Sequence, residues 1–339
     1  MTYLKTLLVV ILSYFLYLPA LAANCKATTP SDSSIVNFLQ DEYHVKFTNN
    51  NRIVVFKTGK EKFDDLFPAI RAAKESIHLE YFNFRNDSIS KELFTLLVHK
   101  AAEGVKVRAL FDGFGNSSNN RPLRRRHLDS LRARGIEIYE FDPIRFPYLN
   151  HIAHRDHRKI VVIDGQVAYT GGMNVADYYI MGKPEFGEWR DLHTRVEGDA
   201  VGELQRVFLE FWNKVTKQNI HGPQYYPGEK DARQNFGMLK QDTTPTAGTK
   251  QVGVVNRVPK TTPRIIHDTF IHSINTAEKQ ILIINPYLTL CRHLKKALKN
   301  AAKRGVDVQI MVSEKSDIPI TPRIVEYNVH KLMKAGVKV

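Results

Sequence analysis

The sequence reads HRKIVVID at residues 157–164 and GGMN at residues 171–174, and these two stretches decide the fold. Alternate side chains of a strand share a face, so we expect His157 and Lys159 to point the same way. The apolar run that follows predicts a buried strand. The two glycines let the backbone approach a ligand closely, and Asn174 brings an amide donor. A histidine that can attack phosphorus, beside groups that hold charged oxygens, is typical of a phosphate-ester site.

The spacing of these residues, H-x-K-x4-D-x6-G-G-x-N, resembles the signature of the phospholipase D superfamily. Flanking segments resemble the cardiolipin synthase branch of that superfamily. They are Leu79–Phe82, Glu103–Val107, Trp189–His193 and Pro286-Tyr287. The resemblance runs from about Phe56 to Val339. It implies an α/β fold of the phospholipase D type, with two repeated α-β-α sandwich halves of which the second is incomplete here.

The resemblance also implies roles for the residues of the motif. His157 is expected to attack the phospholipid phosphorus and to form a phosphohistidine, which splits one difficult displacement into two. Lys159 and Asn174 are expected to bind the non-bridging oxygens and the charge that grows on them. Gly171 and Gly172 are expected to line the same substrate-binding turn.

Two carboxylates complete the predicted catalytic set. Asp164 ends the predicted strand, and its role in the family is closer to fixing the turn than to chemistry. Asp191 precedes a segment that alternates like a strand over residues 192–196. In the family an acidic residue at this place holds the catalytic imidazole by its other nitrogen, which fixes the tautomer. Glu185 or Glu188 is the alternative for that role.

The chain contains an internal repeat of strands and helices. Gly104 and Gly305 each separate a predicted helix from a strand, and Gly135 and Gly336 do the same, so both pairs are 201 residues apart. A glycine between a helical pattern and a β-branched run indicates a helix end. Alternating helices and strands predict a parallel or mixed sheet in each half.

The repeat also predicts where a second motif belongs. His157 lies 19 positions beyond Ile138, and Ile138 corresponds to Val339, the last residue given. Full-length members of the family build one active site from two such motifs, so we expect the second motif beyond Val339 and little catalysis from these 339 residues alone. The expected regions are a signal peptide or anchor (1–22), an N-terminal extension (23–45), the first phospholipase D-like domain (46–220), a linker (221–260) and a partial second domain (261–339).

Charge predicts an anionic partner. The formal net charge is +14, which favours binding to membrane lipid, nucleic acid or another phosphate ester. We expect an anionic phospholipid similar to phosphatidylglycerol, at a membrane surface, and no stable nucleic-acid complex. Arginines crowd the segment 121–134, which we interpret as a basic helix near the site that contacts lipid headgroups.

The N-terminus resembles an export signal. Lys5 precedes an apolar run from Leu7 to Leu18, and the small-residue site Ala20-Leu21-Ala22 follows. The run is shorter than the roughly 20 residues of a spanning helix, so we expect cleavage after Ala22, with a retained anchor as the alternative. The protein is then expected in the cell envelope, facing the periplasm or the outer side of the inner membrane. Its two cysteines give no disulfide framework.

No metal or cofactor is expected at the active site. His151, His154 and His157 recur every three residues, which suggests zinc. The family's chemistry needs no metal, however, and His157 already has a role. The segment 112–115, Asp-Gly-Phe-Gly, is interpreted as a glycine turn, and Trp189 is interpreted as packing or lining the entrance.

Three functions remain open at the level of sequence. The leading one is a cardiolipin-synthase-type phosphatidyltransferase. The second is a phospholipase D-type phosphodiesterase or nuclease that completes its site by pairing two chains. The third is an inactive chain that binds anionic lipid. The sequence leaves open the acceptor alcohol, the oligomeric state, and the balance between transfer and hydrolysis.

Overall fold

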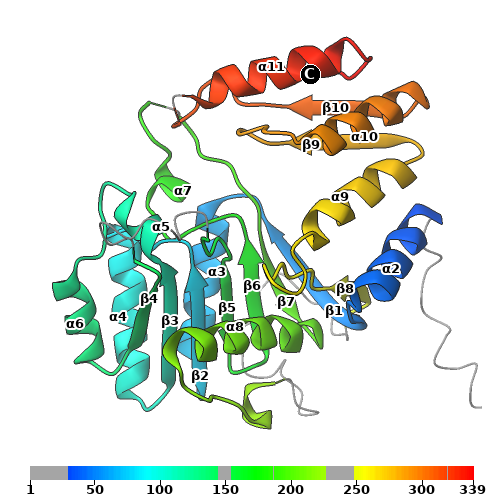
Figure 1. Cartoon of the computed structure of the whole chain (residues 1–339). Helices are drawn as coiled ribbons and strands as arrows, with labels where there is room; N and C mark the ends of the chain where they lie inside the picture. The colour runs from blue at the N-terminus through cyan, green and yellow to red at the C-terminus, as the bar shows by residue number, and fades with distance from the viewer. Residues whose placement is uncertain (1–29, 144–153, 186, 227–247, 319) are drawn as a thin grey trace, which may run out of the picture. The chain divides into compact units, whose positions relative to one another are not determined.

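A computed structural model describes residues 30–143, 154–185, 187–226, 248–318 and 320–339 (Figure 1). These residues form two compact units, and each is described by itself. The first unit lies within residues 50–254, and the second combines residues 30–49 with described residues of 255–339. Both units mix helices with sheet, which confirms the predicted α/β class.

The first unit is built on an eight-stranded sheet with the order β4-β3-β2-β5-β6-β7-β1-β8. Strands β2, β3 and β4 are parallel, whereas β5, β6, β7 and β1 alternate in direction. The bounds are β1 (Phe47–Phe56), β2 (Ser76–Tyr81), β3 (Lys106–Asp112), β4 (Glu137–Phe141), β5 (Ile160–Ile163), β6 (Val167–Gly171), β7 (His193–Glu197) and β8 (Lys250–Gly253).

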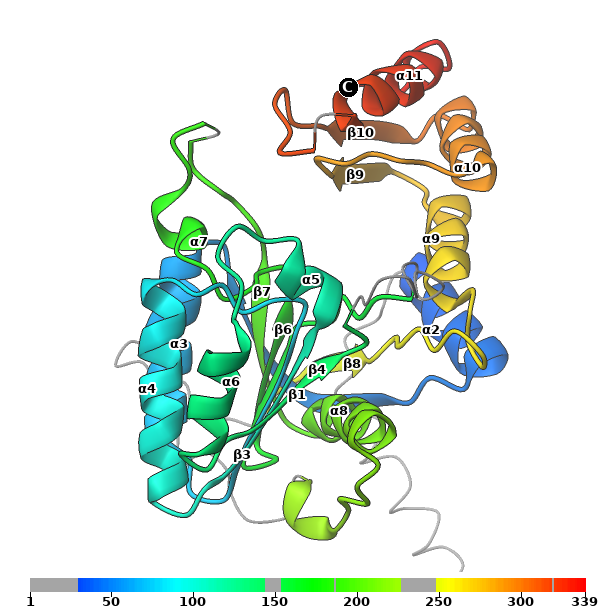
Figure 2. The same ribbon diagram turned by 60° about the vertical axis from the view of Figure 1, so that its left-hand side comes forward.

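Helices cover both faces of this sheet. Figure 2 shows α3, α4 and α6 on one face and α8 on the other. The bounds are α3 (Gly59–Ala72), α4 (Ser88–Ala102), α5 (Gly113–Ser117), α6 (Arg125–Arg132), α7 (Tyr178–Met181), α8 (Ala200–Thr216) and the 3₁₀ turn η1 (Pro223–Tyr225).

Strand β5 shows why its sequence is apolar at every position. Val161 and Ile163 belong to the core under α3 and α4, whereas Ile160 and Val162 pack with residues of α8. A strand covered on both faces reads as a continuous apolar run, so the predicted buried strand over 160–163 is confirmed.

The second unit repeats part of the same order. Helix α2 (Pro30–Tyr43) packs on α9 (Ile265–Thr276), and β9 (Gln280–Ile284), α10 (Arg292–Lys303), β10 (Asp307–Met311) and α11 (Thr321–Met333) follow. Strands β9 and β10 pair in parallel, as β2 and β3 do in the first unit. One face of this small sheet exposes three apolar side chains. They are Leu282 (64% exposed), Ile284 (79%) and Met311 (65%).

Several elements differ from the sequence-based expectation. Within the expected N-terminal extension, α2 packs on α9, and the Phe38 ring stacks on His272 at 4.3 Å. The expected linker contributes strand β8 to the sheet, and residues 227–247 of it lie outside the described part of the chain. The basic segment forms a helix only over Arg125–Arg132.

The expected export segment, residues 1–22, lies outside the described residues. Among the residues that the structure describes, no helix is both long and apolar enough to cross a membrane.

Candidate active site

One edge of the large sheet collects the residues of the motif. Strand β5 runs antiparallel to its neighbours β2 and β6. Ile160, the first residue of β5, pairs with Glu80 of β2 on one side and with Thr170 of β6 on the other. The residues before β5 therefore lie beside the carboxyl ends of both neighbouring strands. Strand β7 begins at the same edge, because His193 pairs with Gly171. Segments far apart in the chain thus meet around residues 157–159.

His157 stands at the surface of this edge, with its ring 4.7 Å from the ring of Phe82. Partial burial of the imidazole lowers the pKa of His157 to about 4. The positive charge of the nearby Lys159 lowers it further, and the negative charge of Asp156 opposes the shift. The imidazole is therefore neutral at pH 7. A neutral imidazole has the free electron pair that attack on phosphorus requires.

Lys159 lies almost wholly buried beneath this histidine. Its Nζ donates a hydrogen bond of 2.7 Å to the His157 carbonyl and sits 5.3 Å from the Phe82 ring centre. Burial lowers the pKa of Lys159 to about 8, although Asp156, Asp191 and Asp112 pull in the opposite direction. The ammonium is thus charged at pH 7 and available to an anionic oxygen.

Asn174 is buried at the turn after β6. Its Oδ1 accepts a hydrogen bond of 3.4 Å from Asn83 N, and its Nδ2 donates one of 3.4 Å to Tyr179 Oη. The turn itself needs glycine, because a Cβ on Gly172 would lie 2.2 Å from an Asp191 carboxylate oxygen. The structure therefore brings His157, Lys159 and Asn174 to one edge of the sheet.

Asp191 lies at this edge but is not bonded to the histidine. Its carboxylate accepts from its neighbour Leu192 N at 2.7 Å, and no hydrogen bond joins it to His157 among the described residues. Burial raises the pKa of Asp191, while the Leu192 N–H and the charges of Lys159 and Lys62 oppose the rise. The role expected for it, holding the imidazole, remains a prediction.

The alternative carboxylates stand apart from this arrangement. Glu188 pairs with the exposed Arg190 at 2.9 Å, and Glu185 is exposed.

Asp164 lies at the far end of β5 from His157. Its two oxygens accept hydrogen bonds of 2.8 Å from the backbone nitrogens of three residues that lead into β2, Lys74, Glu75 and Ser76. Its own backbone is left-handed, with φ 52°. These contacts join the end of β5 to the start of β2. Asp164 therefore supports the fold and is not a neighbour of His157.

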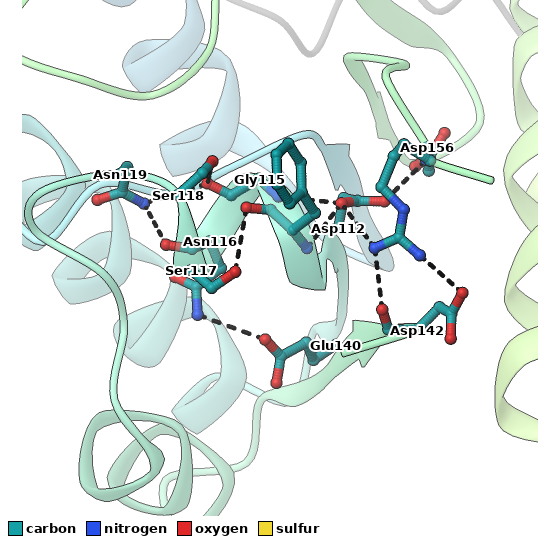
Figure 3. A network of polar contacts seen from close by, with 11 residues as sticks. Asp112, Gly115, Asn116, Ser117, Ser118, Asn119, Glu140, Asp142 and Asp156 are labelled. Atoms are coloured by element: carbon teal, nitrogen blue, oxygen red, sulfur yellow. Dashed lines mark hydrogen bonds and ion pairs between the residues drawn. The ribbon is translucent and has the colours of Figure 1, made fainter. Parts of the chain in front are cut away.

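Asp112 anchors the residues just before the nucleophile. Figure 3 shows its carboxylate between helix α5 and Asp156. One oxygen accepts from Phe114 N at 2.9 Å and Gly115 N at 3.0 Å, and the other accepts from Asp156 N at 2.8 Å. The predicted glycine turn at 112–115 was therefore wrong: Asp112 caps a short helix and fixes the backbone that precedes His157.

A buried group of opposite charges lies next to this anchor. The Nε of Arg158 is 2.9 Å from Glu80 Oε1 and 3.0 Å from Asp156 Oδ1. Burial raises the pKa of Glu80 well above its usual range, and the neighbouring Asp156 raises it further. The guanidinium between the two carboxylates holds the backbone of residue 158 in place between His157 and Lys159.

The sequence analysis did not predict two buried basic side chains near the site. Lys62 is fully buried in α3, and its Nζ donates to the carbonyls of Met173 and Asn174 at 3.1 and 3.2 Å. His193 is also fully buried, and both its ring nitrogens lack a hydrogen-bond partner in the described part of the chain. Burial lowers the pKa of both side chains.

The sequence held one signal for Lys62. It lies next to Phe63 and four positions before Leu66, in a segment whose apolar residues recur at helical spacing, so a lysine there is out of place. His193 gave no such signal, because it alternates with polar residues on an ordinary strand pattern.

The structure does not test the zinc alternative of His151, His154 and His157. His151 lies outside the described residues, and His154 is exposed. Trp189 is half-buried and packs on Tyr178 and Tyr179, with ring centres 4.9 and 6.4 Å away, as the packing interpretation expected.

Comparison with known proteins decides the family. The sequence profile described as cardiolipin synthase, PLD-like domain, matches residues 66–190 and 270–339, more than half of the chain. The chain belongs to this family. The recognised motif is thereby confirmed as that of a phospholipase D-like protein.

Relatives agree with this assignment, and one solved structure has the same fold. A cardiolipin synthase of Halalkalibacterium halodurans is 36% identical over 87% of this chain and 55% of its own length. One of Staphylococcus aureus is 36% identical over 86% and 56%. The chain therefore spans about half the length of the curated relatives it matches. The crystal structure of a phosphatidylserine synthase of Haemophilus influenzae has the same fold, with TM-score 0.59 and 14% identity over 90% of this chain and 73% of that one.

Proposed function

We propose that this chain carries the nucleophilic half of a cardiolipin-synthase-type phosphatidyltransferase. The observation that supports the proposal is a surface histidine, neutral at pH 7, above a buried charged lysine. The relatives named cardiolipin synthase suggest a phospholipid as the substrate.

The reaction proceeds by two displacements at one phosphorus. An imidazole nitrogen of His157 forms a bond to phosphorus, and the bond from phosphorus to the leaving alcohol's oxygen breaks. That alkoxide takes a proton from a general acid, for which we propose the histidine of a second motif outside the present sequence. In the second step the oxygen of a second alcohol forms a bond to phosphorus, and the bond from phosphorus to the His157 nitrogen breaks, which frees the imidazole. The proton of that alcohol returns to the second histidine, which lost its proton in the first step and now acts as the base. Lys159 and Asn174 bind the non-bridging oxygens in both steps.

The donor lipid and the location of the protein are further parts of the proposed function. We propose an anionic phospholipid similar to phosphatidylglycerol as donor, presented at a membrane surface, and an exported protein at the outer side of the inner membrane. The net charge of +14 and the apolar N-terminal run support these points. N-terminal sequencing of the membrane fraction tests the export, because cleavage after Ala22 would expose Ala23.

The test begins by reading the coding DNA beyond the codon for Val339. The extended protein, its His157→Asn variant and a His99→Asn control are then expressed in cells that lack cardiolipin, and the lipids are measured. His99 is exposed near the end of α4, far along the chain from the motif. We expect cardiolipin from the extended protein and the control, and a loss of at least about 10⁴-fold in His157→Asn.

Each other outcome has a definite meaning. Cardiolipin at control levels from His157→Asn would contradict the nucleophile assignment. Phosphatidic acid as the only product would indicate a hydrolase instead of a transferase. Absence of a second motif in the DNA would contradict the proposed general acid.

A further inference from the structure

Three ligand-type side chains converge in the second unit, outside the site described above. His267 lies on α9, Cys291 is the N-cap residue directly before α10, and His293 is the second residue of α10. Their potential ligand atoms all lie within 4.8 Å of one another. The two imidazole rings are nearly perpendicular, with centres 5.8 Å apart.

The first histidine is also held as metal-binding histidines usually are. His267 Nδ1 lies 2.7 Å from Asp268 Oδ1, and the other oxygen of Asp268 accepts from Tyr43 Oη at 2.7 Å. A carboxylate on one ring nitrogen fixes the tautomer and leaves the other nitrogen free for a metal. Tyr43 belongs to α2, so the support comes from a third element of the same unit.

The residue at the start of α10 is unusual for its position. Helices prefer Ser, Thr, Asp or Asn there, because these side chains accept a hydrogen bond from the first turn. Cys291 takes the extended backbone of a cap without a side-chain capping bond. Its thiol is exposed, as is the His293 ring, so both can reorient around an ion without disturbing the core.

We propose that His267, Cys291 and His293 bind a zinc ion that joins α9 to the start of α10. Two imidazoles and one thiolate are the ligand types that zinc prefers, with about 2.0–2.1 Å to nitrogen and 2.3 Å to sulfur. Ligand atoms around a tetrahedral zinc are then roughly 3.5 Å apart, so the surface side chains close in by about an ångström.

Three protein ligands would leave the fourth position of a tetrahedral zinc to water. Three protein ligands on two helices bind less tightly than four, and the neighbouring Arg292 and Lys295 repel a cation. We therefore expect reversible binding that stabilises the second unit in proportion to the free zinc concentration, and not a metal on which folding depends.

The experiment uses the 339-residue chain, kept reduced and freed of metal, with cobalt(II) as the spectroscopic probe and zinc as competitor. We expect one cobalt per chain, a near-ultraviolet absorption band from thiolate coordination, and its loss on adding one equivalent of zinc. Cys291→Ser should abolish the band. His293→Ala should weaken zinc binding by at least about tenfold.

A control separates these ligands from surface histidines in general. His330 is exposed on α11 of the same unit, and His330→Ala should bind cobalt and zinc as the unaltered chain does. Zinc should raise the melting temperature of the unaltered chain and of His330→Ala, but not that of Cys291→Ser. A thiolate band that persists in Cys291→Ser, or zinc binding unchanged in His293→Ala, would overturn the proposal.

Discussion

In the proposed reaction His157 and Lys159, which are two positions apart, need different charge states. The imidazole must be neutral to attack, and the ammonium must stay charged to bind oxygen. Burial favours the neutral form of both, yet the carboxylates around Lys159 keep its pKa at about 8, whereas His157 falls to about 4. Between these two pH values both side chains are in the required state.

This difference gives a prediction that needs no catalysis. The NMR signals of the His157 ring in the 339-residue chain should titrate with a midpoint near pH 4, well below the usual 6.5. Lys159→Met should raise that midpoint, because it removes a positive charge that disfavours the imidazolium. His157→Asn assigns the signal. A midpoint near 6.5, unmoved by Lys159→Met, would contradict the electrostatic account of the site.

The same shifts predict the activity profile of the extended enzyme. His157 gains its proton as the pH falls through about 4 and can no longer attack. Lys159 loses its proton as the pH rises through about 8 and no longer stabilises the oxyanion. Activity should therefore be highest between these values.

Sequence spacing predicted residues that the structure brings to one edge of the sheet, and it missed Lys62 beside them. His157, Lys159 and Asn174 lie within one short stretch, whose strand and turn geometry is local. Lys62 bonds the carbonyl of Asn174 from 112 residues away, and a contact of that kind depends on how α3 packs over the sheet. No local pattern contains that information.

At the scale of elements, α5 links the core to the nucleophile. A Cβ on Gly115 would lie 2.1 Å from the carbonyl oxygen of Phe82, and the Phe82 ring packs on His157. Gly115→Ala must therefore displace either the helix or the segment after β2. We expect a loss of about 1–3 kcal/mol in the free energy of unfolding, together with a changed His157 signal.

Urea unfolding followed by tryptophan fluorescence measures that loss. Ser117→Ala is the matched control, since Ser117 is exposed on the same helix and bonds only the carbonyl of Phe114. It should change stability by about 0.5 kcal/mol or less. Equal effects from both substitutions would show that α5 tolerates a side chain at position 115.

The sequence predicted well those strands whose residue pattern follows directly from burial. β5 is apolar throughout because helices cover both its faces. Helix α5 was missed because it has five residues and depends on a cap from Asp112. The packing of α2 on α9 joins residues more than 200 positions apart, which no periodicity indicates.

For the whole molecule the dominant property is positive charge. A protein of net charge +14 should bind vesicles of phosphatidylglycerol and not of phosphatidylcholine, and raising the salt from about 0.05 to 0.5 M should release it. Arg124 and Arg126 are exposed around the start of α6. If that surface contacts headgroups, changing both to Gln weakens binding most.

Cosedimentation with the vesicles measures this, and the control removes the same charge elsewhere. Lys74 lies just before β2 and Lys106 is the first residue of β3, and both side chains are exposed. They lie at the end of the sheet opposite the site. Their change to Gln should have the smaller effect. Equal losses from the two double variants would show that binding follows total charge alone.

The small sheet of the second unit has a practical consequence for anyone who purifies this chain. Its face of Leu282, Ile284 and Met311 is open to water, and repulsion between like-charged molecules opposes contact between such faces in solution. The salt that strips bound lipid from the protein also shortens the range of that repulsion to about 3 Å at 1 M. Protein that has been freed of lipid with high salt should therefore be the most prone to precipitate. A mild detergent, rather than more salt, should keep it in solution.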